Sequence, residues 1–173
     1  MEPPGRMNRA RLPIAVLLVL TLQYSAFQDV RIRGVHPDAL LLFAIAVAIV
    51  AGSESGAVVG FGVGLLADLF VQTPLGLSAL TFALVAFAVG ALQATLIRSS
   101  WWITPVTAFV ASAAGIVLFV VLGAVLGQTQ LLDADVPAIV AVVAVGNAVL
   151  ALPAVRLASW AMAGLEPDRS YAR

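Results

Sequence analysis

The chain is organised as long uncharged stretches separated by short segments that hold its charged residues. Six stretches carry no charge, namely residues 12–28, 39–53, 55–67, 69–97, 99–132 and 136–155. A helix needs about 20 mostly apolar residues to cross a bilayer, and hydrocarbon offers an irregular backbone no hydrogen-bond partners. The apolar residues also lack the alternation of a membrane β-strand. The pattern therefore predicts an all-α, polytopic membrane protein with six transmembrane helices in a single bundle.

Turn-forming and charged residues place the boundaries of these spans. Residues 37–71 are too long for one span, because at about 1.5 Å per residue they would extend about 50 Å. We expect two short antiparallel helices there, joined by a turn at 52–55, and a kink at Pro153 in the last helix. The predicted spans are 12–27, 37–51, 56–71, 77–97, 105–126 and 137–160. The predicted regions are an N-terminal tail at 1–11, a transmembrane domain at 12–160 and a C-terminal tail at 161–173.

The distribution of Arg predicts the orientation, since all nine basic residues are Arg. With six spans, both tails and the loops at Glu54 and Arg98 share one side, which holds seven Arg. The opposite side holds only Arg31 and Arg33. Cytoplasmic loops carry the excess of basic residues, so we expect both tails in the cytoplasm. The first span also resembles a signal peptide, but the large side chain of Tyr24 makes a poor cleavage site, and we favour a retained helix.

Composition narrows the possible chemistry. The chain is 62% hydrophobic and 10% charged, whereas soluble domains are about half apolar and about a quarter charged. It has no Cys, and His36 is its one histidine, which argues against a disulfide framework, a thiolate site or a histidine-rich metal cluster. A net charge of zero gives no basic surface for nucleic acid. We predict no catalytic residues, no cofactor and no metal, and we expect lipid to be the main surrounding partner.

Glycine recurs at every fourth position around the third predicted span. Gly52, Gly56, Gly60 and Gly64 follow this interval, and Gly62 is added to them. Residues four apart share one helical face, and a face without side chains lets another helix approach closely. Gly56, Gly60 and Gly64 are therefore candidate contact residues. We favour packing within the chain, and a docking face for a partner helix is the alternative.

Two acidic residues flank the predicted hairpin. Asp68 lies in an otherwise apolar run near the end of the third span, and Asp38 lies at the start of the second span. The antiparallel arrangement would bring both to the same outer level, close to the turn formed by Pro74 and Gly76. Ionisable residues within a membrane usually face the protein interior or a water-filled cavity. We favour a structural ion pair or helix cap that shapes the outer hairpin. The alternative is a proton or cation site, although such sites normally lie nearer the midplane.

Four further polar residues lie within predicted spans, namely Gln23, Gln93, Ser112 and Asn147. Each can form a hydrogen bond across helices, and in membranes such bonds contribute about 0.6–2 kcal/mol. We favour this role over a ligand pocket lined by the four side chains.

One stretch carries a series of motifs. A Pro-Asp pair precedes a Leu-rich helix, a Gly-x-x-x-Gly-Phe helix ends in Leu-x-Asp, and a Pro-Leu-Gly turn and a further apolar helix follow. In this pattern residues 37–90 resemble the rod shape-determining protein MreD family. One departure is Glu54, where family members often carry a basic residue. The matching positions are Pro37-Asp38, Gly56, Gly60-Phe61, Gly64-Leu65-Leu66, Asp68-Leu69, Pro74-Leu75-Gly76, Ala79-Leu80 and Gly90.

The resemblance implies a non-enzymatic scaffold of the bacterial elongation machinery in the inner membrane. Such a protein would bind an MreC-like bitopic partner and support lateral peptidoglycan synthesis and cell shape. It would connect indirectly with MreB, RodA and the elongation penicillin-binding protein. The family also resembles, in fold, the S components of energy-coupling-factor transporters. The alternative function is therefore that of a substrate-binding membrane subunit of a vitamin transporter.

Overall fold

The computed structural model describes residues 10–26, 37–70, 74–93, 102–128, 130 and 135–163. Its α-helices are α1 (Arg11–Thr21), α2 (Ala39–Asp68), α3 (Leu77–Gln93), α4 (Ile103–Val125) and α5 (Val136–Met162), and the π-helical turn η1 (Leu22–Ala26) follows α1. No strand occurs among these residues, which confirms the all-α prediction. The helices α2, α4 and α5 are long and apolar enough to cross a membrane, while α1 with η1 and α3 are shorter apolar helices.

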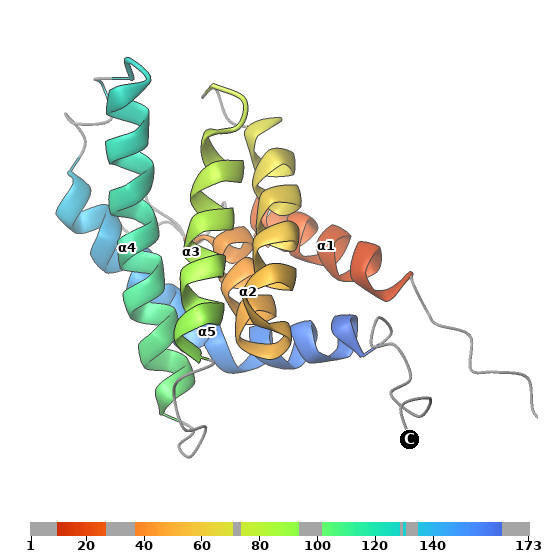
Figure 1. Cartoon of the computed structure of the whole chain (residues 1–173). Helices are drawn as coiled ribbons and strands as arrows, with labels where there is room; N and C mark the ends of the chain where they lie inside the picture. Colours follow the sequence, from red (N-terminus) through yellow and green to blue (C-terminus); the bar gives the residue numbers. More distant parts are fainter. Residues whose placement is uncertain are drawn as a thin grey trace, which may run out of the picture.

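The helix α2 is a hairpin that reverses at one residue. Gly52 has φ 87° and ψ −178°, outside the helical region, although helical residues stand on both sides of it. A Cβ atom placed on Gly56 would lie 2.6 Å from the Cβ atom of Ala48, so the residues after Gly52 fold back on those before it. Figure 1 shows the reversal as the orange part of α2 turning into the gold part. We refer to residues 39–51 as the first arm and to residues 53–68 as the second arm.

This hairpin confirms the predicted break but corrects its form. The expected turn covered residues 52–55, whereas Ser53, Glu54 and Ser55 are already helical. The reversal needs only Gly52 because glycine reaches positive φ without the steric penalty of a Cβ atom. At about 1.5 Å per residue, each arm is shorter than the hydrocarbon thickness of about 30 Å. The number of spans therefore stays a prediction, since the length of α2 as a whole does not measure a crossing.

The first arm forms the centre of the bundle. Residues 39–48 are all buried, and Leu41, Ile45 and Ala46 have no exposed surface at all. The second arm packs along α3, and α5 contacts α4, the hairpin and α1. In Figure 1 the second arm, α3 and α4 stand side by side, and α5 passes beneath them after changing direction. Pro153 lies inside α5, as the predicted kink requires.

Contacts at both ends attach α1 and η1 to the bundle. The guanidinium carbon of Arg11 lies 5.7 Å from the ring centroid of Trp160 near the end of α5. At the other end, the ring centroids of Tyr24 and Phe70 are 4.6 Å apart. The π-helical form of η1 was not predicted, and it places Gln23 at the start of α2.

The remaining helix ends agree with the predicted spans within a few residues. After α4, Gly127 has φ 84°, and the amide of Gln128 donates to the carbonyl of Gly123 at 2.8 Å, which is a glycine-based helix termination. Before α5, the carboxylate of Asp135 accepts from the amide of Ala138 at 3.4 Å. Several predicted features lie outside the described residues, namely the loop at 28–36, residues 71–73, the segment 94–101 and most of both tails, at 1–9 and 164–173.

Candidate functional site

Asp68, the one acid deep in an apolar run, connects α2 to α3. Its side chain is 3% exposed, and its two carboxylate oxygens accept hydrogen bonds from three backbone amides. These amides belong to Gly76 at 2.8 Å, Ser78 at 3.0 Å and Ala79 at 3.3 Å. The first turn of a helix leaves its N–H groups without intrahelical partners and favours a negative charge. Asp68 supplies both an acceptor and a charge to the start of α3.

Asp38 has a corresponding position at the start of α2. It is the N-cap residue, and its Oδ1 atom accepts from the amide of Leu41 at 3.0 Å. Gln23 reaches the same helix end from η1. Its Oε1 atom accepts from the amide of Ala39 at 2.7 Å, and its Nε2 atom donates to the carbonyl of Pro37 at 3.4 Å. The side chain of Gln23 therefore adds a second cap to the first arm.

The turn between α2 and α3 contains the other two predicted hairpin residues. The amide of Leu77 donates to the carbonyl of Pro74 at 3.2 Å. Gly76 has φ 99°, a conformation that side-chain-bearing residues rarely adopt. Because this turn follows the second arm and Asp38 begins the first, the hairpin brings Asp38 and Asp68 to the same end of the bundle. The contact between Tyr24 and Phe70 lies at that end too.

The glycine stripe of the second arm faces the inside of the protein. A Cβ atom on Gly60 would lie 2.8 Å from the carbonyl oxygen of Phe82, and one on Gly64 would lie 2.6 Å from the Cα atom of Ala79. Both neighbours belong to α3, while Gly56 meets the first arm. Gly62 has no such neighbour within 4 Å. The stripe therefore provides close helix contact within the chain, and this packing occupies the face considered for a partner.

The predicted bond across helices is present between α4 and α5. Asn147 and Ser112 have no exposed surface, and Nδ2 of Asn147 donates to Oγ of Ser112 at 2.9 Å. The Oδ1 atom of Asn147 is buried and has no hydrogen-bond partner among the residues that the structure describes. Gln93 differs from the other polar residues, because its carboxamide makes no hydrogen bond within the described part of the chain although the residue is only 8% exposed.

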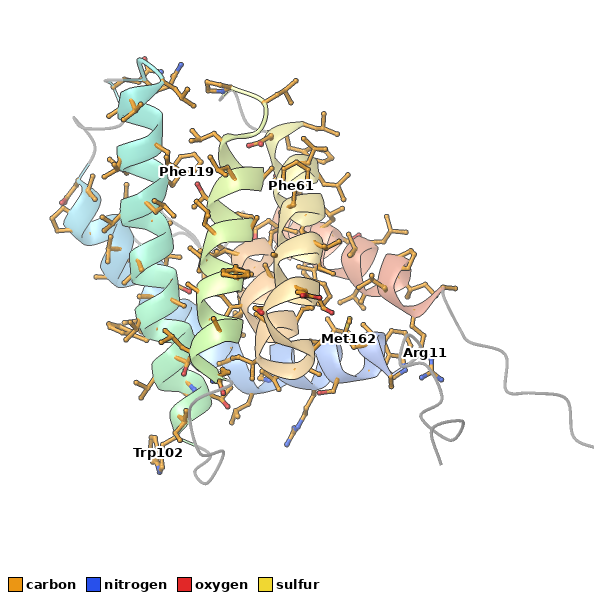
Figure 2. The ribbon with its side chains drawn as sticks, in the orientation of Figure 1. Arg11, Phe61, Trp102, Phe119 and Met162 are labelled. Atoms are coloured by element: carbon orange, nitrogen blue, oxygen red, sulfur yellow. The ribbon has the colours of Figure 1, made fainter. Side chains whose placement is uncertain are left out.

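A cavity of about 340 Å³ lies between the ends of the hairpin and the helices α4 and α5. Its polar lining consists of Gln23, Tyr24, Asp38 and Ser78, and the rest of its wall is apolar. Phe119 of α4 is part of that wall, and Figure 2 shows this residue toward the end of the bundle opposite Trp102. Gln23 is engaged in capping α2, so its carboxamide is already bonded to the protein.

A larger groove of about 1020 Å³ separates α3 from α4. Its lining is almost wholly apolar, with small residues such as Ala88, Ala111 and Ala114 among larger ones. Several of the larger side chains are exposed, including Leu84 at 46% and Val110 at 59%. An exposed apolar surface of this kind is suited to contact with lipid or with another membrane helix.

Comparison with known protein families shows to which family this chain belongs. A family model for the rod shape-determining protein MreD matches residues 6–153 of the 173. The chain belongs to the MreD family. Members of this family determine rod shape, and their role is structural. The apolar helices and the family together make the chain a membrane protein. No curated protein and no solved structure matches it.

The MreD motifs recognised in the sequence lie together in space. The Pro-Asp pair caps the first arm, the glycines bring the second arm against α3, and Asp68 bonds the turn that contains Gly76. The family match also extends well beyond residues 37–90, into α1, α4 and α5. The resemblance therefore describes one structural unit, the α2 hairpin with α3, inside a longer family domain.

Two contacts of this MreD-family bundle were not predicted. Gln23 was identified as a polar membrane residue, but nothing in the sequence assigned it to the start of α2. A Cβ atom on Gly90 of α3 would collide with the amide nitrogen of Ser53, so Gly90 seats the Gly52 reversal against α3. The available signals were its place among the positions that match the MreD pattern and its being an isolated glycine inside an apolar helix, which often has a packing reason.

Proposed function

We propose that this chain is a non-enzymatic scaffold in the bacterial inner membrane that binds an MreC-like bitopic protein. Through that partner it would act indirectly with MreB, RodA and the elongation penicillin-binding protein in lateral peptidoglycan synthesis. The observation that carries this proposal is the MreD-family match over residues 6–153. The use of Asp68, Asp38 and Gln23 as caps supports it, because these polar side chains, of which Asp68 and Gln23 are buried, bond to the ends of helices.

We further propose that six helices span the membrane and that both termini are cytoplasmic. This topology counts the two arms of α2 as separate spans. The Arg distribution supports it, since cytoplasmic segments carry the excess of basic residues. The contact between the start of α1 and the end of α5 is compatible with this, because Arg11 lies over the ring of Trp160 and close to Met162 in Figure 2.

The carrier alternative has less support. The MreD family lends no support to vitamin transport. Asp68, which would be the natural candidate for binding a cation or substrate, accepts three backbone hydrogen bonds. Its carboxylate is therefore engaged in the α2–α3 turn.

Co-purification with the host MreC-like protein, from membranes solubilised in mild detergent, tests the proposed function. We expect the bitopic protein to be recovered with the chain, and vitamin uptake by the host to be unchanged on its deletion. A membrane protein of similar size from the same host, carrying the same affinity tag, is the control for nonspecific recovery. Saturable uptake that depends on Asp68, without recovery of the MreC-like protein, would favour the carrier instead.

A further inference from the structure

The helices of the bundle meet in two different ways, and the glycines show the difference. Gly64 of the second arm lies against backbone atoms of α3. The glycines of α4 and α5 lie instead against side chains near the start of the first arm. A Cβ atom on Gly115 would lie 2.9 Å from Cδ2 of Leu41, and one on Gly146 would lie 2.7 Å from Cγ of Pro37. This second contact is the more adaptable one, because a side chain such as that of Leu41 can change its rotamer.

The side chains of the protein leave space on two sides of α4. The groove of about 1020 Å³ separates one side of this helix from α3, and the cavity of about 340 Å³ separates another side from the hairpin. Small residues border both spaces, Ala111 at the groove and Gly115 at the cavity. A Cβ atom on Gly115 would lie 3.6 Å from Cγ2 of Val85 in α3. Close packing holds a helix in place, and α4 has it only along this narrow contact.

The first part of α5 is joined to α4. The hydrogen bond of 2.9 Å between Asn147 and Ser112 connects the two helices, and both residues are completely buried. Ala151 of α5 and Ala108 of α4 lie in one small core cluster with Leu42 of the first arm. Small residues and polar bonds of this kind hold membrane helices together. We refer to α4 and residues 136–152 of α5 as the α4–α5 unit.

The last part of α5 belongs to the main core of the bundle. Ala158 and Ala161 have no exposed surface, and they lie in the same core cluster as Ala15 of α1. Pro153 stands between this part and the α4–α5 unit. Proline has no N–H for the carbonyl four residues earlier, and its ring crowds that carbonyl, so a helix bends at such a residue. Figure 1 shows α5 changing direction along its length.

We propose that the α4–α5 unit turns about Pro153 relative to the hairpin and α3, and that this movement changes the widths of the groove and the cavity. The unit has an internal bond, an adaptable contact with the first arm, and a proline where it joins the rest of the bundle. A molecule that occupies either space would favour one position of the unit, because a ligand shifts an equilibrium toward the state that it binds better. The proposal does not depend on which partner the chain binds.

Distances between pairs of spin labels test the movement. The chain has no Cys, so the labels attach only to cysteines that are introduced for them. We place them in pairs at four exposed positions, namely Phe61 in the second arm, Val121 and Val149 in the α4–α5 unit, and Ser159 beyond Pro153. Pulsed electron paramagnetic resonance of the complete chain in lipid nanodiscs then gives the distribution of distances for each pair.

Phe61 is the fixed reference in these measurements. We expect its distances to Val121 and Val149 to be spread more widely than its distance to Ser159, by about 2 Å or more, the size of helix shifts in switching proteins. The pair Val121 and Val149 should give a narrow distribution, because both labels move together. Equally narrow distributions for all pairs would show that the bundle is rigid and would overturn the proposal.

Two further results would also contradict it. A broad distribution for Val121 and Val149 would show that α4 and the first part of α5 do not move as one unit. A distribution for Phe61 and Ser159 as broad as that for Phe61 and Val149 would show that Pro153 does not separate a moving part of α5 from a fixed one.

Substitution of the proline tests the hinge directly. We expect Pro153→Ala to narrow the distribution for Phe61 and Val121, because alanine restores the backbone N–H and removes the ring that bends the helix. The pair Val121 and Val149 is the control, since its narrow distribution should be the same in the variant and in the unchanged chain. A distribution for Phe61 and Val121 that stays broad in the folded variant would exclude Pro153 as the hinge.

Discussion

The carboxylate of Asp68 accepts a hydrogen bond from the amide of Gly76 at 2.8 Å, and this contact ties the end of α2 to the turn before α3. The same carboxylate reaches two amides at the start of α3, those of Ser78 and Ala79. A single acidic side chain thus satisfies three backbone donors in an apolar region. This accounts for an acid whose burial would otherwise be costly.

We predict that Asp68→Ala lowers the stability of the chain more than any surface acid-to-alanine change. The substitution leaves the amides of Gly76, Ser78 and Ala79 without their acceptor, and each buried unpaired group costs about 1–3 kcal/mol. Asp68→Asn retains one oxygen acceptor and should be intermediate. Thermal unfolding in detergent measures the effect.

Asp135→Ala is the matched control for this experiment. Asp135 is also an N-cap acid, but it is exposed and accepts one longer bond, from Ala138 at 3.4 Å. Its loss should reduce stability by no more than about 1 kcal/mol, at the lower end of N-cap effects. Equal melting temperatures for Asp68→Ala and Asp135→Ala would contradict the role assigned to Asp68.

The helical fold and the hairpin could be predicted from the sequence because both follow from the properties of the lipid that surrounds the chain. Lipid imposes helices on apolar segments, and residues 37–71 were too long for one crossing. Which helix surfaces meet was not predictable in this way. A membrane helix is apolar on all sides, so its hydrophobic pattern does not identify the buried face. Most of the first arm is buried, whereas α4 has few buried residues, although both segments are uninterrupted apolar sequence.

The candidate residues also fall into two groups, those that the sequence alone identified and those whose role depends on how the helices pack. Asp38, Asp68 and the glycines were found because charge and glycine are rare enough in a span to require a reason. The contact of Gly90 with Ser53 and the cap supplied by Gln23 depend on which elements pack together. The groove between α3 and α4 depends on the separation of two helices, which no single residue signals.

We predict a graded response to alanine in the glycines of the hairpin. Gly60→Ala and Gly64→Ala place a methyl group within 3 Å of α3 backbone atoms, so the second arm has to move away from α3. We expect both to lose stability by about 1–3 kcal/mol, the range for overpacked cores. Gly52→Ala meets no neighbour, but φ 87° with ψ −178° is a conformation nearly restricted to glycine, and it imposes strain of about 1–3 kcal/mol on alanine.

Gly62→Ala is the control for these glycine variants. It lies in the same helical arm with open space around it, and alanine has the higher helix propensity by about 1 kcal/mol. This variant should be at least as stable as the unchanged chain. The ranking can be measured as thermal unfolding of the purified proteins in one detergent. A Gly62→Ala variant as unstable as Gly64→Ala would mean that the stripe has no special packing role.

The six-span topology leads to a prediction for reporter fusions. A reporter that is active only in the periplasm should be inactive when fused after Arg173 and active when fused after Gln130. A reporter active only in the cytoplasm should give the reverse result. The reason is the seven-to-two division of Arg between the two predicted sides. Periplasmic activity after Arg173 would require an odd number of spans or the opposite orientation.

The bond between Asn147 and Ser112 leads to a prediction of non-additive mutations. Asn147→Ala and Ser112→Ala each remove one partner of a bond that joins α4 to α5 at 2.9 Å. The double variant leaves no partner unpaired, so its loss of stability should be smaller than the sum of the single losses. Hydrogen bonds between membrane helices have measured couplings that average about 0.6 kcal/mol and reach about 1.7 kcal/mol.

The unpaired Oδ1 atom of Asn147 affects the expected size of each step in this cycle. Asn147→Ala removes a buried acceptor that already lacks a partner, so part of the lost bond is offset by relief of that unsatisfied group. Ser112→Ala removes only the acceptor of the existing bond and leaves both polar ends of Asn147 buried. We therefore compare the loss of unfolding free energy divided by the number of side-chain atoms removed. This quotient should be larger for Ser112→Ala than for Asn147→Ala. Unfolding of the four proteins of the cycle in one detergent measures both quantities, and strictly additive losses would show that the two side chains are not coupled.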